Sequence, residues 1–373
     1  MSIEQNNGNQ TILVTGGSGL LGSHVVKKLL QDQQHNFAVL VRNEQQAHIW
    51  DIFGIKTIIG DLEDPDFTLP NSITTVIHIA AIAGDWVDKH KAQAVNVKGT
   101  EYLVKQAEQV GCKKFIYVST IGVYGHNKYL NATEDKELKT SWTYERTKLE
   151  AEQFIQDYVK TTTNDMELII VRPSSMYGSG DRYILPAYSK YLRKGKMVLI
   201  GGGKSLYPIM HAEDAASVLI QLVDDQFTNG NHLAVYHLCD GSNITQNEFI
   251  NLIKTTIGVD GELRSIPYRT AYLASMFFEL KGKVTHTEPR IFRKRVKYLG
   301  VTRQVSIEKA KTELGFVPKW SPQEGIPSVL KSLEEEENYK ANGIETSVIN
   351  GITEKEILDI IPYHLFKELK GNT

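Results

Sequence analysis

The sequence predicts an α/β protein built on a doubly wound parallel sheet, with a smaller C-terminal lobe. Its 373 residues are 41% apolar and 23% charged, a composition that can bury a large core. Short apolar runs alternate with helical stretches up to about residue 175, as they do in parallel sheets with helical crossovers. A glycine-rich turn directly follows the first apolar run. These three observations predict the fold class.

The apolar runs also predict the order of the elements. Beyond about residue 175 the alternation fades into loops, helices and short strands, including one at 235–238, which we assign to the lobe. We expect a helix over 23–30, directly after the glycine turn. The strands expected for the sheet lie at residues 12–15, 37–41, 57–59, 76–79, 115–119 and 168–171.

Charge, cysteine content and hydropathy exclude several classes of function. Lys and Arg total 42 against 44 Asp and Glu, so the net charge of −2 indicates no nucleic-acid partner. The polar start lacks the apolar core of a signal peptide, and no apolar run approaches the roughly 20 residues of a membrane span, so we expect a cytoplasmic protein. With only Cys112 and Cys239 and no HExxH pattern, we expect no metal site.

The glycine-rich turn, with the sequence T-G-G-S-G-L-L-G, occupies residues 15–22. Only glycine lets the backbone turn this tightly and approach a pyrophosphate, while the free amides and the positive end of the following helix attract the anion. The strand-turn-helix context favours dinucleotide binding over an ordinary tight turn. The cofactor-binding residues expected in this turn are Gly16, Ser18, Gly19, Leu20 and Gly22.

Arg42 follows the second predicted strand, where the adenosine ribose of a dinucleotide is recognised. A carboxylate at this place would accept hydrogen bonds from a free 2′-hydroxyl, whereas a guanidinium suits a 2′-phosphate. We therefore expect NADP(H) rather than NAD(H), the alternative being a solvated surface arginine. Asp61 and Leu62, after the third strand, are expected to flank the adenine unless Asp61 is only a turn residue.

Tyr144 and Lys148 lie four residues apart in a helical stretch, so both project from one helix face. A fixed ammonium and the positive nicotinamide ring would lower the pKa of the phenol from about 10, and Tyr144 could then act as acid and base near neutral pH. Thr120, after the strand at 115–119, would hydrogen-bond the reacting oxygen. The alternative is a surface pair, because Tyr-x-x-x-Lys is common in helices.

Further motifs follow one another in a defined order: G-D-L at 60–62, H-I-A-A at 78–81, N-V-K-G-T at 96–100, V-S-T at 118–120 and R-P-S-S-M-Y-G at 172–178. With the glycine turn and Y-x-x-x-K, the chain resembles an extended short-chain dehydrogenase/reductase of the NAD-dependent epimerase/dehydratase superfamily from about residue 11 to 330. The resemblance implies a Rossmann fold. By resemblance, Ala80 and Ala81 line the cofactor's phosphates, Pro173 and Ser174 touch its nicotinamide end, and Asn96 ties a helix to the sheet.

Neighbouring groups distinguish the branches of this family. Sugar-nucleotide dehydratases carry Asp-Glu after the catalytic Thr, where this chain has Ile121 and Gly122. Many epimerases place a diphosphate-binding Arg a few residues before a His-x-x-Asp, but here the chain reads Tyr-Pro-Ile-Met at 207–210. The rest is similar to the 3β-hydroxysteroid dehydrogenase branch and related 3-oxoacyl reductases. The expected substrate-binding residues, each of which also suits a core, are Ile82, Trp86, Met176, Tyr177, Tyr183 and Met210.

The expected function is that of an NADP(H)-dependent oxidoreductase that interconverts a ketone and a secondary alcohol on an apolar substrate of steroid-like, lipid or 3-oxoacyl type. A nucleotide-sugar epimerase that uses the same tyrosine and lysine is the first alternative. A scaffold that senses NADP(H) without turnover is the second. Thr120, Tyr144 and Lys148 argue against the scaffold, because a sensor needs no proton-transfer groups.

These expectations give a predicted organisation of the chain. Residues 1–10 form a disordered leader, 11–175 mainly the NAD(P)-binding domain, 176–330 mainly the substrate-binding lobe, and 331–373 an acidic and helical appendage. Within the appendage we expect a helix over 354–361, opened by Thr353 with Glu356 in a capping box. The appendage is expected to pack on the body of the protein or on a second subunit.

An apolar stretch at 268–280 precedes a basic region at 281–303, whose one acidic residue is Glu288. We expect this region to dock on an anionic membrane, to bind an acyl group carried on phosphopantetheine, or to cap the lobe with solvated charges. Relatives often form homodimers through the helices that carry Asn96 and Tyr144, so a homodimer is expected by resemblance. The basic residues are Lys281, Lys283, Arg290, Arg293, Lys294, Arg295, Lys297 and Arg303.

Overall fold

The computed structural model describes residues 11–64, 66–140, 142–225, 232–285, 287, 289, 291–341 and 348–371. The predicted leader at 1–10 lies outside the described residues.

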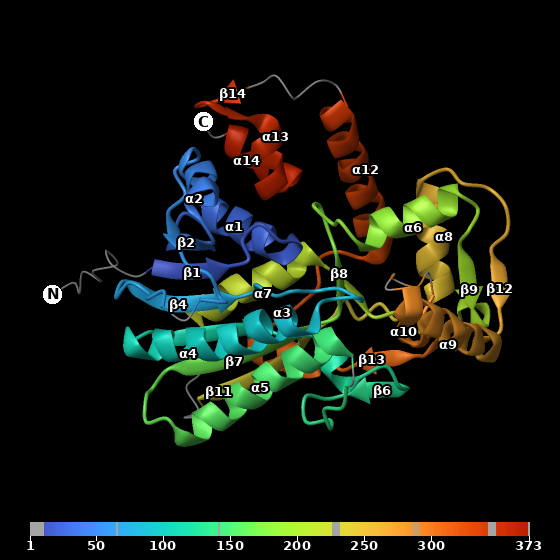
Figure 1. Ribbon diagram of the computed structural model, residues 1–373, viewed down its shortest axis with the longest axis horizontal. Helices are drawn as coiled ribbons and strands as arrows, with labels where there is room; N and C mark the ends of the chain where they lie inside the picture. The colour runs from blue at the N-terminus through green and yellow to red at the C-terminus, as the bar shows by residue number, and fades with distance from the viewer. Residues whose placement is uncertain are drawn as a thin grey trace.

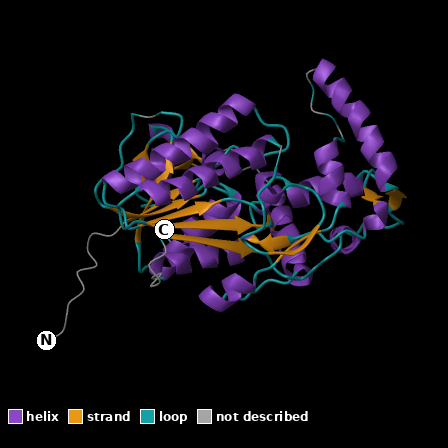
Figure 2. Ribbon diagram, turned by 90° about the horizontal axis from the view of Figure 1, so that it is seen from below, coloured by secondary structure: helices purple, strands orange, loops and turns teal. Residues whose placement is uncertain are grey.

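A seven-stranded sheet forms the centre of the molecule (Figures 1 and 2). Its strands are β1 (Thr11–Thr15), β2 (Asn36–Val41), β3 (Thr57–Ile59), β4 (Ile73–His78), β5 (Lys114–Val118), β7 (Glu167–Pro173) and β11 (Leu233–Leu238). Their order is β11-β7-β5-β4-β1-β2-β3, and every neighbouring pair is parallel. The direction of winding reverses between β1 and β4, so a crevice for a ligand is expected where the carboxyl ends of these strands separate. The predicted doubly wound fold is confirmed.

Helices cover both faces of this sheet because successive strand residues point to opposite sides. Val14 and Ile77 belong to one hydrophobic cluster, whereas their neighbours Leu13 and Val76 belong to another. The first cluster packs against α1 (Leu20–Asp32), α2 (Glu44–Asp51) and α7 (Ala212–Asp224). The second packs against α4 (Gly99–Gln109) and α5 (Thr143–Thr161), with the short α3 (Lys89–Gln93) and a π-helix (Ala94–Lys98) before α4.

The strand β11 corrects the predicted division of the chain. Residues 235–238 were expected in the lobe, but β11 pairs with β7 as the edge strand of the central sheet. Helix α7, directly before it, packs against α1. After residue 176 the chain therefore leaves the sheet, builds much of the lobe, and returns to the sheet as β11. The side chain of Tyr236 on β11 is buried in the first cluster of the sheet core.

The smaller lobe has a hydrophobic core of its own, which includes Leu185, Leu199, Phe249 and Ile326. Its helices are α6 (Ile184–Arg193), α8 (Gln246–Thr256), α9 (Tyr268–Thr285) and α10 (Arg293–Gly300), and it contains the parallel pair β9 (Val198–Ile200) and β12 (Arg264–Ile266). Parallel pairs also join β8 (Ser175–Tyr177) to β10 (Ile209–His211) and β6 (Tyr129–Ala132) to β13 (Arg303–Val305), which α11 (Glu308–Leu314) follows. Short 3₁₀ turns cover Ile121–Tyr124 and Gly201–Gly203.

The predicted appendage packs on the body of the protein. The boundary at 331 falls inside one helix, α12 (Pro322–Ala341), which is followed by the hairpin β14 (Val348–Ile349) and β15 (Ile352–Thr353). The predicted capping box is confirmed, since Thr353 and Glu356 open α13 (Glu354–Ile360) with both reciprocal hydrogen bonds. The last helix, α14 (Tyr363–Gly371), adds Leu365 and Phe366 to the cluster beneath α1. No described helix combines the length and apolar character needed to cross a membrane.

Candidate functional site

The glycine turn between β1 and α1 has the close backbone packing that a pyrophosphate site requires. Gly16 has a φ of 73°, and a Cβ on it would lie 2.9 Å from the Cα of Ala80. A Cβ on Gly22 would lie only 2.0 Å from the carbonyl oxygen of Gly16. Helix α1 has no side-chain cap and no acidic residue in its first turn, so its positive end is available to an anion. These residues fit the dinucleotide that the sequence predicts.

A chain of hydrogen bonds holds Ala80 beside this turn. Thr15 Oγ1 accepts hydrogen bonds from the amides of Ile79 and Ala80, each at 3.1 Å, so its own proton goes to His78 Nδ1 at 2.7 Å. His78 then donates from Nε2 to Thr100 Oγ1 at 2.9 Å. Burial, with a smaller effect of the nearby Lys148 charge, lowers the pKa of His78 to about 3, so this histidine is neutral.

Arg42 and Asp61 lie at the expected adenosine end of the site. Arg42 directly follows β2 and is exposed, and its amide donates to Gln46 Oε1 at 3.0 Å. Asp61 follows β3 and accepts a hydrogen bond from the amide of Glu63 at 3.0 Å. Leu62 is buried, and its backbone packs closely on Gly99 at the start of α4. A Cβ on Gly99 would lie 2.8 Å from the carbonyl oxygen of Leu62, so only glycine allows the loop to pack this closely on α4.

The predicted catalytic residues Thr120, Tyr144 and Lys148 lie at the carboxyl end of β5 and on α5. Thr120 Oγ1 accepts a hydrogen bond from the amide of Gly122 at 3.1 Å, so its own proton is free to be donated elsewhere. Tyr144 and Lys148 are one helical turn apart. Lys148 is buried, and its Nζ lies 4.1 Å from the centre of the Tyr117 ring on β5, which places the ammonium against the sheet.

Burial changes the pKa of both groups in the protein alone. It lowers the pKa of Lys148 to about 7, although the charge of Glu152 opposes the change. Burial raises the pKa of Tyr144, and the charge of Glu145 adds to the increase. This direction is opposite to the one that the sequence predicts. The prediction included the positive nicotinamide ring, so a lowered phenol pKa depends on groups that bind beside Tyr144.

Glu145 is a buried carboxylate next to Tyr144 that the sequence reasoning missed. Lys294 Nζ lies 2.8 Å from its Oε1, and His126 Nε2 lies 3.3 Å from the same atom. Burial alone would raise the pKa of Glu145, but the hydrogen bond to His126 and the charge of Lys294 lower it to about 2. Lys294 also pairs with Asp85 at 3.1 Å, so it joins α10, α5 and the loop after β4.

The other cations of the basic region are largely paired rather than solvated. Arg293 binds Glu279 at 2.7 Å and Arg295 binds Asp85 at 3.0 Å, and Lys297 donates to Asn127 Oδ1. The guanidinium of Arg303 is buried against the ring of Tyr298, 4.2 Å from its centre. The side chain of Lys283 and all of Arg290 and Glu288 lie outside the described residues. Asp85 lies more than 200 positions before its partners Lys294 and Arg295, so no local sequence pattern indicated these ion pairs.

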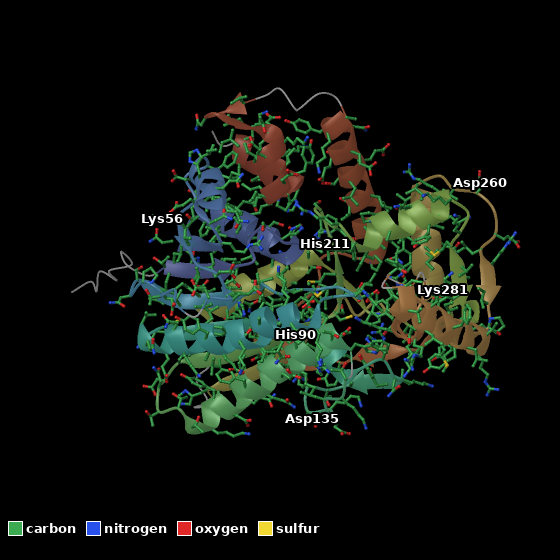
Figure 3. The ribbon with its side chains drawn as sticks, in the orientation of Figure 1. Lys56, His90, Asp135, His211, Asp260 and Lys281 are labelled. Atoms are coloured by element: carbon green, nitrogen blue, oxygen red, sulfur yellow. The ribbon has the colours of Figure 1, made fainter. Side chains whose placement is uncertain are left out.

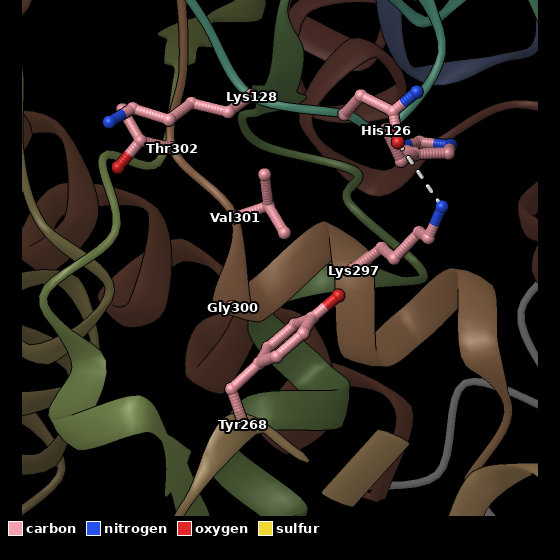
Figure 4. Close-up of a pocket in the computed structure, with 8 residues that line it drawn as sticks. His126, Lys128, Tyr268, Lys297, Gly300, Val301 and Thr302 are labelled. Atoms are coloured by element: carbon pink, nitrogen blue, oxygen red, sulfur yellow. Dashed lines mark hydrogen bonds between the residues drawn. The ribbon is translucent and has the colours of Figure 1, made fainter. Parts of the chain in front are cut away.

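A cavity of about 440 Å³ opens beside this charge network (Figure 4). His126 lies in its wall and also contacts Glu145, so the cavity and the carboxylate next to Tyr144 share one side chain. Lys297 reaches across to Asn127 at 3.2 Å. The cavity is lined by His126, Asn127, Lys128, Tyr268, Lys297, Gly300, Val301 and Thr302.

None of the six predicted substrate-binding residues lines this cavity. Tyr177 and Met210 are buried in the core, which corrects their assignment: Tyr177 packs where a Cβ on Gly325 of α12 would meet its hydroxyl at 2.5 Å. Tyr183 is 77% exposed and Trp86 is 48% exposed, with the Trp86 ring 6.5 Å from that of Phe292. The remaining two, Ile82 and Met176, are partly buried at the edges of the two clusters of the sheet core.

Asn96 joins the loop after β4 to α5. Its Oδ1 accepts from the amide of Ile82 at 2.7 Å, and its Nδ2 donates to Thr147 Oγ1 at 2.9 Å. Pro173 ends β7, and Ser174 follows it with its amide bonded to the sheet. Their contact with nicotinamide, like that of Ala81 with the phosphates, stays a prediction. Among the described residues no group of three or more His, Cys, Asp or Glu side chains is placed to hold a metal ion.

Comparison with known proteins agrees with this geometry. Residues 12–236 match the sequence pattern of the NAD dependent epimerase/dehydratase family. A 2-alkyl-3-oxoalkanoate reductase from Stenotrophomonas maltophilia is 26% identical and covers 84% of this chain and 97% of its own length. A 3beta-hydroxysteroid-dehydrogenase/decarboxylase isoform 2 from Arabidopsis thaliana is 27% identical over 86% of this chain, and the match spans only 61% of the plant protein.

Solved structures share the fold. The structure of MoeE5 in complex with UDP-glucose and NAD has a TM-score of 0.66 and 21% identity, and the match covers 87% of this chain and 99% of that one. The family match agrees with the glycine turn, the ordered motifs and the seven-stranded sheet, which all indicate the same family. The chain belongs to the NAD dependent epimerase/dehydratase family and is an extended short-chain dehydrogenase/reductase.

Proposed function

We propose that this protein is an oxidoreductase that uses NADP(H) to interconvert a ketone and a secondary alcohol on an apolar substrate. The observation that carries the proposal is the grouping of Thr120, Tyr144 and Lys148 at the carboxyl edge of the sheet that also bears the glycine turn. One hydroxyl with a free proton, one phenol and one ammonium are the groups that proton transfer to a carbonyl oxygen needs.

The protein residues have separate tasks in this reaction. The bound cofactor supplies or accepts the hydride. In the reducing direction Tyr144 donates its proton to the carbonyl oxygen, and in the oxidising direction it removes the proton of the alcohol. Thr120 polarises the same oxygen, and the Lys148 ammonium stabilises the phenolate. General acid-base catalysis of this kind contributes about 100- to 10,000-fold to the rate.

The glycine turn, with Ala80 held against it, would hold the pyrophosphate of the cofactor. Arg42 supports NADP(H) over NAD(H), because an exposed guanidinium after β2 can form charge-assisted hydrogen bonds with a 2′-phosphate. Asp61 follows the neighbouring strand β3 and accepts a hydrogen bond from the amide of Glu63, but its carboxylate would repel a 2′-phosphate. Arg42 is therefore the proposed partner of the 2′-phosphate.

An apolar substrate is supported by the segment that binds a diphosphate in many epimerases. Tyr207, Ile209 and Met210 are buried there, so the segment supplies core side chains and no cation. Lys294 and Arg295 on α10 are already paired with Asp85. The similar 2-alkyl-3-oxoalkanoate reductase agrees with a substrate of this class.

A nucleotide-sugar epimerase is the second candidate, and the cations of α10 favour it. Lys294 and Arg295 lie beside the loop after β4, and a diphosphate that displaced Asp85 would meet two positive charges. The fold shared with MoeE5, whose structure contains UDP-glucose and NAD, is consistent with this alternative.

A substrate panel separates the two candidates. The panel contains steroids, 3-oxoacyl compounds and nucleotide sugars, each assayed by the absorbance of reduced nicotinamide with NADPH and with NADH. The proposal expects NADPH oxidation with an apolar ketone and no protection against thermal unfolding by UDP- or dTDP-sugars. Thermal protection by a nucleotide sugar, without oxidation of NADPH by any ketone, would replace the proposal by the epimerase.

A further inference from the structure

Helix α9 lies at the end of the lobe (Figure 1). A stripe of its apolar side chains is exposed to solvent. Its members are between 46% and 73% exposed, and no described part of the chain covers them. They recur at intervals of three and four residues, so they share one face of the helix. The stripe consists of Leu273, Met276, Phe277, Leu280 and Val284.

The opposite face of α9 attaches the helix to the lobe with small or polar side chains and with the partly buried rings of Tyr268 and Tyr272. Ala271, Ser275 and Glu279 are buried there, and Ala271 packs in a cluster with Val296 of α10 and Ile200 of β9. The leucine, methionine, phenylalanine and valine side chains of α9 are therefore exposed, unlike those of a helix that merely covers a core. Exposed apolar patches of this kind mark surfaces that bind another molecule.

The charges beside the stripe are positive. Arg269 and Lys281 are exposed on α9. The carboxylate of Glu279 is on the buried face, where it accepts hydrogen bonds from the backbone amide and the guanidinium of Arg293. An apolar face with cations beside it complements a lipid surface whose headgroups are negative.

We propose that α9 docks the protein on an anionic membrane, with the helix lying in the plane of the lipid surface. The helix has 18 residues and is about 27 Å long, which suits an in-plane position. A second copy of the chain fits the stripe less well, because it would bring the Arg269 and Lys281 cations of both copies together around the contact. The inference does not depend on the substrate proposed above.

Two ion pairs connect the proposed membrane-binding helix α9 with the catalytic residues. Arg293 joins α10 to α9 through Glu279, and Lys294 joins α10 to Glu145 beside Tyr144. Two ion pairs on one short helix thus connect the lipid-facing surface with the catalytic helix α5. A substrate that dissolves in lipid would meet the protein on this side.

The test is co-sedimentation of the full chain with vesicles of phosphatidylcholine alone and of phosphatidylcholine mixed with phosphatidylglycerol. We expect binding to the anionic vesicles and little to the neutral ones. Arg269→Glu with Lys281→Glu should weaken binding by about five-fold or more for each cation. Leu273→Ser with Phe277→Ser should abolish sedimentation with the vesicles. Each of these side chains is exposed, so the variants should keep the thermal stability of the wild type.

Matched controls change the same kinds of side chain elsewhere. Lys56→Glu alters an exposed lysine at the opposite end of the molecule from Lys281 (Figure 3), and Val317→Ser alters a valine that is 73% exposed. Both should bind vesicles as the wild type does. Equal binding to neutral vesicles, no binding to either kind, or equal losses in the controls would overturn the proposal. The proposal would also be overturned if the protein were a dimer without lipid and the α9 variants made it monomeric. Binding to acyl carrier protein without binding to vesicles would overturn it as well.

Discussion

The cofactor half of the molecule (residues 11–173) and the α9–α10 segment of the smaller lobe (residues 268–300) are held together in different ways. In the cofactor half, the ion pair of Arg172 and Glu152 is completely buried, and Tyr124 and the carbonyl oxygen of Glu134 accept further hydrogen bonds from Arg172. In the α9–α10 segment, the pair of Arg293 and Glu279 is partly exposed, and large apolar side chains of α9 face outward.

This difference separates two tasks. A buried charge pair and close backbone contacts tolerate little change, and they position the groups that bind the cofactor and move a proton. Exposed pairs contribute little to folding, because water screens them. Changes at the surface of the α9–α10 segment should therefore cost less folding free energy than changes in the interior of the cofactor half.

We expect the largest effect at Gly22, in the tightest contact of the cofactor half. In Gly22→Ala the new Cβ would lie 2.0 Å from the carbonyl oxygen of Gly16, a backbone atom that cannot move alone. NAD(P) binding should be lost, and the free energy of unfolding should fall by about 1–3 kcal/mol or more. Calorimetric titration and urea unfolding measure both. Gly371→Ala, whose Cβ would meet nothing within 4 Å, is the control, and cofactor binding by Gly22→Ala at wild-type affinity would contradict the turn assignment.

The next comparison sets the two ion pairs against each other. Glu152→Gln leaves the Arg172 guanidinium buried without a counter-charge and should cost about 3–5 kcal/mol of unfolding free energy. Glu279→Gln should cost about 1 kcal/mol or less, because water can reach Arg293. Urea unfolding of the two variants under the same conditions gives both values. Equal costs would mean that the two regions do not differ as described.

A pH series of unfolding measurements tests the buried Lys148. Its folded-state pKa of about 7 lies below that of the unfolded chain, so between about pH 7 and 10.5 the unfolded chain binds one proton more. The unfolding free energy of the wild type should therefore rise relative to Lys148→Met, by up to about 1.4 kcal/mol per pH unit. A difference that stays flat over this range would show that the ammonium is not desolvated.

The smallest effect is expected at Arg42, which is exposed. Arg42→Ala should weaken NADP⁺ binding about tenfold or more, because the 2′-phosphate loses a charge-assisted partner, and should leave NAD⁺ binding unchanged. Binding titrations with both nucleotides measure this ratio, with Lys56→Ala as an exposed control. A similar loss for both nucleotides would remove the argument for NADP(H).

Local patterns in the sequence predicted the features that short segments determine. The glycine turn and the box of Thr353 and Glu356 lie within a few residues of their partners, and so do Tyr144 and Lys148 on their helix. The alternation of strands and helices likewise predicted six strands of the sheet. These features needed only periodicity and spacing.

Features that depend on distant packing were missed. The strand β11 returns to the sheet after the excursion into the lobe, and its apolar run does not indicate which sheet it joins. Tyr177 is buried because α12 packs over it at Gly325. The role of Glu145 depends on Lys294, almost 150 positions later in the chain, so no local pattern could show that this carboxylate has a cation.

The central claim is that the Tyr144 phenol transfers the proton of the reaction. Single-turnover reduction by Tyr144→Phe, measured with the apolar ketone that the wild type accepts, tests it most directly. The rate should fall by about 100- to 10,000-fold while the dissociation constant of the cofactor stays close to that of the wild type. A variant that turns over at nearly the wild-type rate, or that loses the cofactor instead, would contradict the claim.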